Sequence, residues 1–164
     1  MPVYRKELQK MKKVYTCFTT DVIHEAHINI IKEAAKYGEV YVGVMTDRAM
    51  VSFDRFPTIP LEGRIRKIKA IPGVSHVIVQ DSVMYDQIIR ELRPDYVIHG
   101  DNWLSGPTKL IRDNAKSALD SYGGKIIDIP YTYNENIKKI EKKTLQTLTH
   151  FSHSSQPSLF HLFH

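Results

Sequence analysis

The stretch KVYTCFTTDVIHEAHINIIK, residues Lys13–Lys32, decides the fold of this chain. Its first residues are apolar and rich in β-formers, and a polar turn, Thr19-Thr20-Asp21, follows at once. From Glu25 onward, apolar residues recur at helical spacing. The stretch therefore predicts a strand that ends in a turn and opens directly into a helix. Such a helix start can hold phosphate, because its backbone N–H groups and the positive end of the helix dipole face the anion.

Two histidines, His24 and His27, stand three residues apart at the predicted helix start and share one face of it. A helix N-terminus disfavours imidazolium until an anion arrives, and both rings can then donate hydrogen bonds to that anion. The plainer alternative is one buried and one exposed histidine that bind nothing. Zinc is a further alternative, although no third ligand has the spacing of a metal site.

Strand and helix patterns alternate along the chain, which predicts an α/β fold: a Rossmann-like, doubly wound, parallel five-stranded sheet with helices on both faces. In such sheets, ligands bind at the carboxyl ends of the strands, near the switch in strand order. The passage 46–60 is polar and contains proline, and it reads as a loop. The expected strands are Lys13–Phe18, Val40–Met45, His76–Gln80, Tyr96–His99 and Lys125–Ile129, and the expected helices are Glu25–Lys36, Leu61–Ile71, Met84–Leu92 and Pro107–Tyr122.

Composition narrows the class of protein. The 164 residues carry a net charge of +5 that is spread along the chain, which suits anionic small substrates better than nucleic acid. The single cysteine, Cys17, lies in an apolar run and is expected to be a buried structural thiol. No apolar run has the length of a membrane span and no secretory signal precedes the domain, so we expect a cytoplasmic protein without a membrane partner.

Three regions are expected. Residues 1–12 form a charged N-terminal extension, residues 13–143 form the domain, and residues 144–164 form a disordered or divergent tail. The tail has no Asp, Glu, Lys or Arg and holds four of the eight histidines. Their irregular spacing argues against a metal site.

In their order and spacing, these motifs resemble the cytidylyltransferase family, a branch of the HxGH nucleotidyltransferases. Lys13–His27 is similar to the family's strand, G-x-F-D turn and H-x-G-H helix start. Thr46-Asp47, Leu61-Glu62-Gly63-Arg64 and Gly100-Asp101-Asn102-Trp103 resemble its later motifs, and the likeness covers about residues 12–132. The amino-acid sequence of the intervening stretches most resembles that of the phosphonate cytidylyltransferase domains associated with phosphoenolpyruvate mutase.

The resemblance implies that an oxygen of a phosphonate or small phosphoester attacks the α-phosphorus of CTP and that pyrophosphate leaves, with Mg²⁺ as cofactor and a homodimer as the assembly. Catalysis is then positioning and charge neutralisation, because the acceptor is already ionised. The resemblance implies that the catalytic residues are His24, His27 and Arg64. It implies that nucleotide or substrate binds at Thr19, Thr20, Asp21, Asp47, Arg55, Asp101 and Trp103, with Asp21 nearest the metal.

Several of these residues have a plainer reading. Arg55 can be a solvated loop arginine, and Asp47 can cap the turn that follows it. Asp101 can be a turn former, and Trp103 can simply cover the edge of the sheet. His99 is expected to be structural.

Before the end of its last strand, the chain departs from the family pattern at three points. The turn lacks the family's glycine, and Ala26 replaces the glycine between the histidines, with Glu25 beside it; Asp54 stands where relatives often have lysine.

After the last strand, YTYNENIKKIEKK replaces the family's hydroxyl-rich segment, and Glu135 is expected to face the phosphates. An impaired nucleotide-binding or regulatory domain is therefore the alternative function. Adenylyl transfer from ATP is a third, and RNA binding is a fourth, disfavoured by the lack of interleaved basic and aromatic residues.

Overall fold

The computed structural model describes residues 11–19, 21–132, 134–140 and 142. Thr20, nearly all of the expected N-terminal extension and the expected tail lie outside the described residues. Within them, no helix is long and apolar enough to cross a membrane.

A five-stranded parallel sheet forms the centre of the molecule. Its strands pair in the order β3-β2-β1-β4-β5, and each pairing is parallel. This confirms the predicted α/β, doubly wound, five-stranded fold. The strands are β1 (Lys13–Phe18), β2 (Glu39–Met45), β3 (His76–Gln80), β4 (Tyr96–Gly100) and β5 (Lys125–Ile129).

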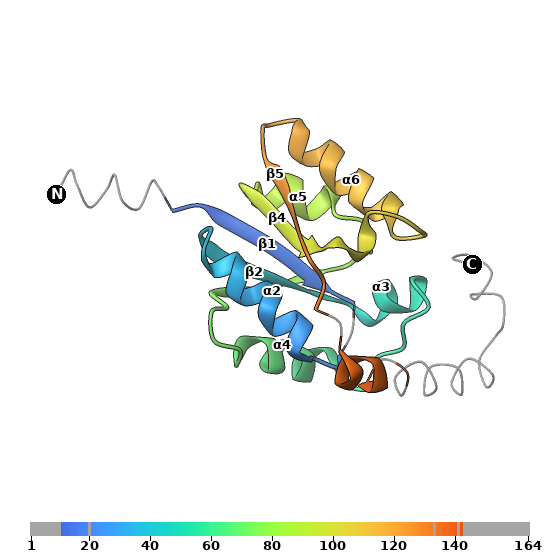
Figure 1. Cartoon of the computed structure of the whole chain (residues 1–164). Helices are drawn as coiled ribbons and strands as arrows, with labels where there is room; N and C mark the ends of the chain where they lie inside the picture. Colours follow the sequence, from blue (N-terminus) through green and yellow to red (C-terminus); the bar gives the residue numbers. More distant parts are fainter. Residues whose placement is uncertain (1–10, 20, 133, 141, 143–164) are drawn as a thin grey trace.

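Helices cover both faces of the sheet (Figure 1). On one face, α2 (Glu25–Ala35) and α4 (Leu61–Lys69) pack their apolar residues against the strands. On the other face lie α5 (Asp86–Leu92) and α6 (Lys109–Asp120), and residues of α3 (Asp47–Ser52) pack into the same apolar cluster. The two apolar clusters explain why the central strands are almost continuously hydrophobic, because both of their faces are buried.

Helix α3 and residues 135–140, which are helical, were not predicted. Helix α3 is six residues long, too short to show a helical apolar stripe, and its start is fixed by a local contact: Thr46 is the N-cap and accepts a hydrogen bond from the Ala49 N–H at 3.2 Å. The single-turn helix η1 (Asp101–Trp103) follows β4 directly. The polar, proline-containing composition of the passage 46–60 therefore gave no sign of α3.

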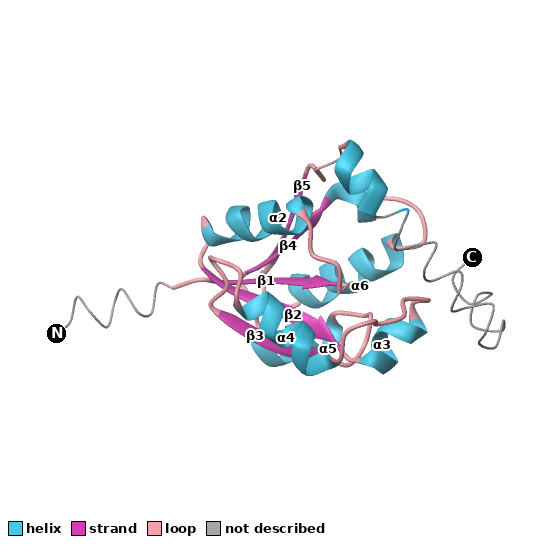
Figure 2. Cartoon of the chain, turned by 90° about the horizontal axis from the view of Figure 1, so that it is seen from below, coloured by secondary structure: helices cyan, strands magenta, loops and turns pink. Residues whose placement is uncertain are grey.

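The switch in strand order lies between β1 and β4. Strand β1 pairs with β2 on one side and with β4 on the other, so the loops after β1 and β4 leave the sheet toward opposite faces. The strand arrows point to one side of the molecule, where α3 and long loops lie (Figure 2). The topology therefore predicts a ligand crevice at this edge.

Candidate active site

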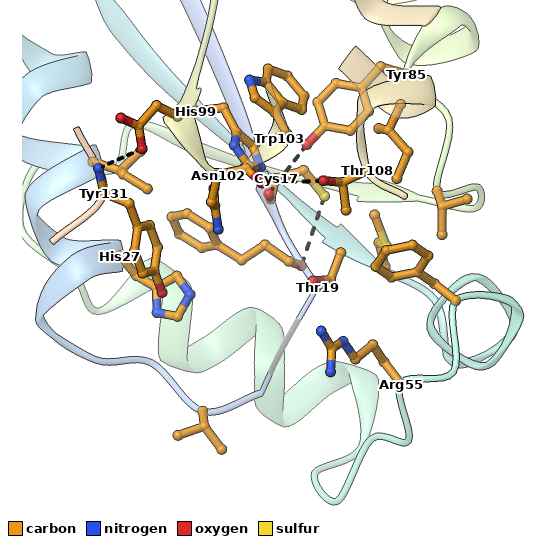
Figure 3. Close-up of a pocket in the computed structure, with 18 of the residues that line it drawn as sticks. Cys17, Thr19, His27, Arg55, Tyr85, His99, Asn102, Trp103, Thr108 and Tyr131 are labelled. Atoms are coloured by element: carbon orange, nitrogen blue, oxygen red, sulfur yellow. Dashed lines mark hydrogen bonds between the residues drawn. The ribbon is translucent and has the colours of Figure 1, made fainter. Parts of the chain in front are cut away.

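A cavity of about 650 Å³ opens at the carboxyl ends of β1, β2 and β4 (Figure 3). Its volume is within the range of small-molecule sites, roughly 300–1,000 Å³. Its walls come from the start of α2, the loops after α3, β3 and β4, the start of α6 and the segment after β5. The lining residues are Cys17, Phe18, Thr19, Val22, His24, His27, Ile30, Met45, Phe53, Arg55, Val83, Tyr85, His99, Asp101, Asn102, Trp103, Thr108, Ile111, Tyr131 and Ile140.

The two histidines build the N-terminus of α2. His24 is the N-cap, with an extended backbone, and its Nδ1 accepts a hydrogen bond from the Ala26 N–H at 3.2 Å. The Nδ1 of His27 accepts in return from the backbone N–H of His24 at 3.1 Å. The pair is thus a capping box made of two imidazoles, and it satisfies two backbone donors at the helix start.

This capping fixes the tautomer of both rings. An Nδ1 that accepts a backbone N–H carries no proton, so the proton of each neutral ring is on Nε2. The ring centroids are 4.1 Å apart, and both residues line the cavity. The helix start therefore presents two N–H donors, on rings tilted by 35° to each other, at the cavity.

His27 is held in its neutral form. It is 8% exposed, and the edge of Phe18 packs against it with the centroids 4.6 Å apart. Burial, together with smaller effects of the nearby His24 and His99, lowers its pKa to about 3. His27 is therefore a neutral hydrogen-bond donor at physiological pH.

The wall opposite α2 is an aromatic stack at the end of β4. His99 lies parallel to Trp103, with centroids 3.9 Å apart and ring planes at 12°. The Trp103 indole N–H donates to Asp128 at 2.6 Å, and Arg112 donates to both oxygens of the same carboxylate. Burial alone would raise the pKa of Asp128, but its bonds to Arg112 and Trp103 bring that pKa below its ordinary value. Trp103 is 1% exposed, and its hydrogen bond to Asp128 holds it within the fold. Stacking on Trp103 in turn holds the ring of His99.

The segment after β5 closes the cavity beside α2. The Tyr131 N–H donates to the Asp101 carboxylate at 3.1 Å, and the Tyr131 hydroxyl lies 3.4 Å from His24 Nε2. Thr132 accepts a hydrogen bond from the Asn29 side chain at 2.9 Å. The departure from the family pattern therefore still gives the site a wall on this side.

Two carboxylates near this wall point away from the cavity. The side chain of Glu135 is 82% exposed and pairs with Lys138 at 3.6 Å, so the expectation that it faces the phosphates is wrong. The inward residue of this turn is Ile137, which is 1% exposed. Glu25 is exposed and accepts a hydrogen bond from Asn134 at 2.9 Å, which draws its charge toward the surface.

Of the predicted site residues, the cavity brings together Thr19, His24, His27, Arg55, Asp101 and Trp103. Figure 3 shows the Arg55 side chain pointing inward from the loop after α3, across the cavity from the His99 wall. Asp21, Asp47 and Arg64 do not line the cavity.

Asp21 instead holds the loop after α3 against the turn after β1. Its Oδ2 accepts from the Thr58 N–H at 2.6 Å, the Thr58 hydroxyl at 2.7 Å and the Ile59 N–H at 2.9 Å. The placement of Asp21 beside Mg²⁺ gains no support, because these bonds occupy one of its two oxygens and its side chain lies outside the cavity. No group of three or more His, Cys, Asp or Glu among the described residues could hold a metal ion.

Arg64 is likewise turned into the protein. Its guanidinium donates to the carbonyl oxygens of Met45 at 2.5 Å and Ile59 at 3.0 Å, and it forms an ion pair with Asp47. The side chain is 3% exposed. These contacts join the end of β2 to the starts of α3 and α4, so Arg64 shapes the floor around the site and does not reach into it.

Residues that were not predicted as site residues complete the cavity, among them Tyr85, Asn102, Thr108 and Tyr131. Tyr131 and Asn102 carry a weak signal, since each lies two or three residues beyond the carboxyl end of a predicted strand. Cys17 lies in the cavity floor as a buried thiol, as predicted, and burial raises its pKa to about 12.

Comparison with known proteins places the chain in a family. A family model described as Cytidylyltransferase-like matches residues 15–154. The chain is 30% identical over 129 residues to the bifunctional protein HldE of Desulfatibacillum aliphaticivorans, covering 77% of this chain and 25% of HldE. It is 30% identical over 141 residues to the FAD synthase of Methanospirillum hungatei JF-1, covering 83% of this chain and 90% of the synthase.

A lipopolysaccharide core biosynthesis protein from Thermoplasma volcanium GSS1 has the same fold. The TM-score is 0.63 at 23% identity, over 75% of this chain and 99% of that one. The chain thus spans about a quarter of the length of the HldE protein that it matches, and nearly all of the FAD synthase.

Proposed function

Since the chain belongs to the cytidylyltransferase-like family, we propose that it transfers CMP from CTP to a phosphonate or small phosphoester and releases pyrophosphate. The observation that carries the proposal is the pair of N-capping histidines. Two Nε2–H donors and a helix N-terminus converge on one end of a cavity large enough for a nucleotide. That arrangement suits a polyanion and offers no nucleophile or general base of its own.

The reaction needs little from the protein besides position and charge. An oxygen of the acceptor forms a bond to the α-phosphorus of CTP, and the bond between the α-phosphorus and the bridging oxygen breaks, so pyrophosphate leaves with the electron pair. Negative charge grows on the leaving group and on the equatorial oxygens. Preorganised donors stabilise that charge because they need no reorientation during the step.

The two histidines act as hydrogen-bond donors in this proposal. Their Nδ1 atoms are held by backbone N–H groups, so the rings cannot turn and their Nε2–H bonds keep a fixed direction. Arg55 would add positive charge from the loop after α3, and Tyr131 would add a hydroxyl beside His24. Asp21 and Arg64 would contribute by fixing the loops that carry these groups.

Mg²⁺ enters the proposal as part of the substrate, the Mg²⁺ complex of CTP. The described residues supply no cluster for a resident ion, and triphosphate oxygens with water can fill most of the octahedral shell of Mg²⁺. We also propose a homodimer, which sedimentation of the purified chain tests.

Adenylyl transfer is the second candidate, because a relative that the chain spans almost completely is named FAD synthase, and FAD contains an adenylyl group. The third candidate keeps nucleotide binding without turnover. Pyrophosphate release with CTP or ATP, and with aminoethylphosphonate, hydroxyethylphosphonate, phosphocholine, phosphoethanolamine, glycerol 3-phosphate or FMN as acceptor, separates the first two. Calorimetry that finds nucleotide binding without pyrophosphate release supports the third.

The sharpest test is a matched pair of variants at His24. Asn is a favourable N-cap, so His24→Asn keeps an acceptor for the Ala26 N–H and removes the Nε2 donor. His24→Ala removes both and costs about 1 kcal/mol of stability. We expect His24→Asn to fold like the wild type and to lose roughly 100-fold in turnover, as for a deleted transition-state donor. Wild-type turnover in His24→Asn would remove the phosphate role of this residue.

A further inference from the structure

His99 stands in the cavity wall with a hydrogen-bonding character opposite to that of His24 and His27. Its Nδ1 lies 2.7 Å from the carbonyl oxygen of Gly100. A carbonyl can only accept, so Nδ1 carries the proton and donates it. The remaining nitrogen, Nε2, therefore has a lone pair and acts as an acceptor.

The ring cannot easily change this state. It is stacked on Trp103, which is anchored through its indole N–H to Asp128, and Asp128 is held in turn by Arg112. Burial lowers the pKa of His99. This effect is larger than the opposite one of the Gly100 carbonyl and the Asp128 carboxylate, which raise the pKa. The imidazole is thus neutral at neutral pH, and within the described residues no protein group is hydrogen-bonded to its Nε2.

An ionised phosphate cannot satisfy such a nitrogen, because both partners would be acceptors. His99 is nevertheless close enough to His27 for the charge on one ring to affect the other. The site thus has two donors at the helix start and an acceptor beside them. The group that follows the α-phosphate in a nucleotide is the nucleoside, whose hydroxyl and amino groups are donors.

Resting on the proposed nucleotide site, we infer that His99 is a specificity-determining residue whose Nε2 accepts a hydrogen bond from an O–H or N–H donor of the nucleoside. The sugar hydroxyls and the amino group of the base share this chemistry. A buried acceptor left unpaired disfavours a ligand that lacks the donor. His99 would therefore discriminate between nucleotides, while His24 and His27 hold the phosphates common to all of them.

The test uses His99→Phe, which keeps an aromatic ring to stack on Trp103 and removes the acceptor. Calorimetry with the Mg²⁺ complexes of CTP, 2′-deoxyCTP, 3′-deoxyCTP, UTP and ATP is run on the wild type and the variant, with thermal melting to confirm the fold. We expect His99→Phe to weaken CTP about tenfold, the value of a hydrogen bond near 1.4 kcal/mol. The analogue that lacks the contacted donor is expected to bind both proteins equally, which identifies the donor as a sugar hydroxyl or the base amine.

The outcomes separate this inference from the proposed function. Equal affinity of the wild type and His99→Phe for CTP, and for ATP, overturns the role of His99 and leaves the nucleotide site standing. Failure of the wild type to bind any of the nucleotides overturns the nucleotide site and His99 together. A loss that is the same for CTP and for every analogue indicates general damage to the cavity, and this too overturns the inference.

Discussion

Lowering the pH from 7 to 5 is expected to destabilise the protein through the burial of one imidazole. Burial, with smaller effects of His24 and His99, lowers the pKa of His27 to about 3 in the folded chain. In the unfolded chain the same group titrates near its ordinary value of about 6.5. Between these two values the unfolded state binds the proton and the folded state does not, so stability falls as the pH falls.

The magnitude follows from the width of that window. Each pH unit below the unfolded value of about 6.5 is worth about 1.4 kcal/mol. About 1.5 units of the step from pH 7 to pH 5 lie below that value, so the step costs about 2 kcal/mol through His27 alone. His99, whose pKa burial also lowers, acts in the same direction. A loss of this size is a substantial part of the stability of a typical domain, about 5–15 kcal/mol.

Urea denaturation at a series of pH values measures the effect, and His27→Asn is the matched control. The Asn side chain keeps an acceptor for the His24 N–H, which Nδ1 of His27 provides in the wild type, and it does not titrate. Between pH 7 and pH 5, we expect the free energy of unfolding of the wild type to fall by about 2 kcal/mol more than that of His27→Asn. Parallel curves for the two proteins would refute the reasoning, because His27 would then titrate alike in the folded and unfolded chains.

Three further predictions concern packing and the cavity wall. Gly43→Ala is expected to lower stability by about 1–3 kcal/mol in urea denaturation, because a Cβ at Gly43 overlaps the Tyr15 hydroxyl; wild-type stability contradicts this. Thr16→Val is expected to raise stability by about 1 kcal/mol, since the buried Thr16 hydroxyl has no hydrogen-bond partner among the described residues; a lower melting temperature argues against it. Tyr131→Phe is expected to keep the melting temperature and weaken CTP several-fold, because it removes the hydroxyl beside His24; unchanged affinity in calorimetry excludes that contact.

Much of the fold was predictable because its signals are local. Buried parallel strands read as short apolar runs, and all five expected strands appear, with bounds that differ by one residue at β2 and at β4. The placement of His24 and His27 at the start of α2 also follows from the sequence. Their use of Nδ1 as caps does not, because Ser, Thr, Asp and Asn are the usual N-caps and no histidine spacing signals a capping box.

The remaining site residues depend on contacts between distant segments. Asp21 accepts its hydrogen bonds from Thr58 and Ile59, which lie more than thirty residues away, so its role could not be read from the turn alone. Arg64 is drawn inward by the carbonyl oxygens at the ends of other elements. Glu135 was expected to face the cavity, but the helical turn places Ile137 inward and leaves Glu135 on the solvent side.

Nitrogen NMR of the two imidazole rings, recorded as CTP and Mg²⁺ are added, tests the central claim most directly. The account predicts that both His24 and His27 carry their proton on Nε2 at neutral pH, with an unprotonated Nδ1. It further predicts that both Nε2–H signals shift on binding while Nδ1 stays unprotonated. A proton on either Nδ1, or Nε2 signals that CTP leaves unchanged, would contradict the claim that these histidines present paired donors to a nucleotide.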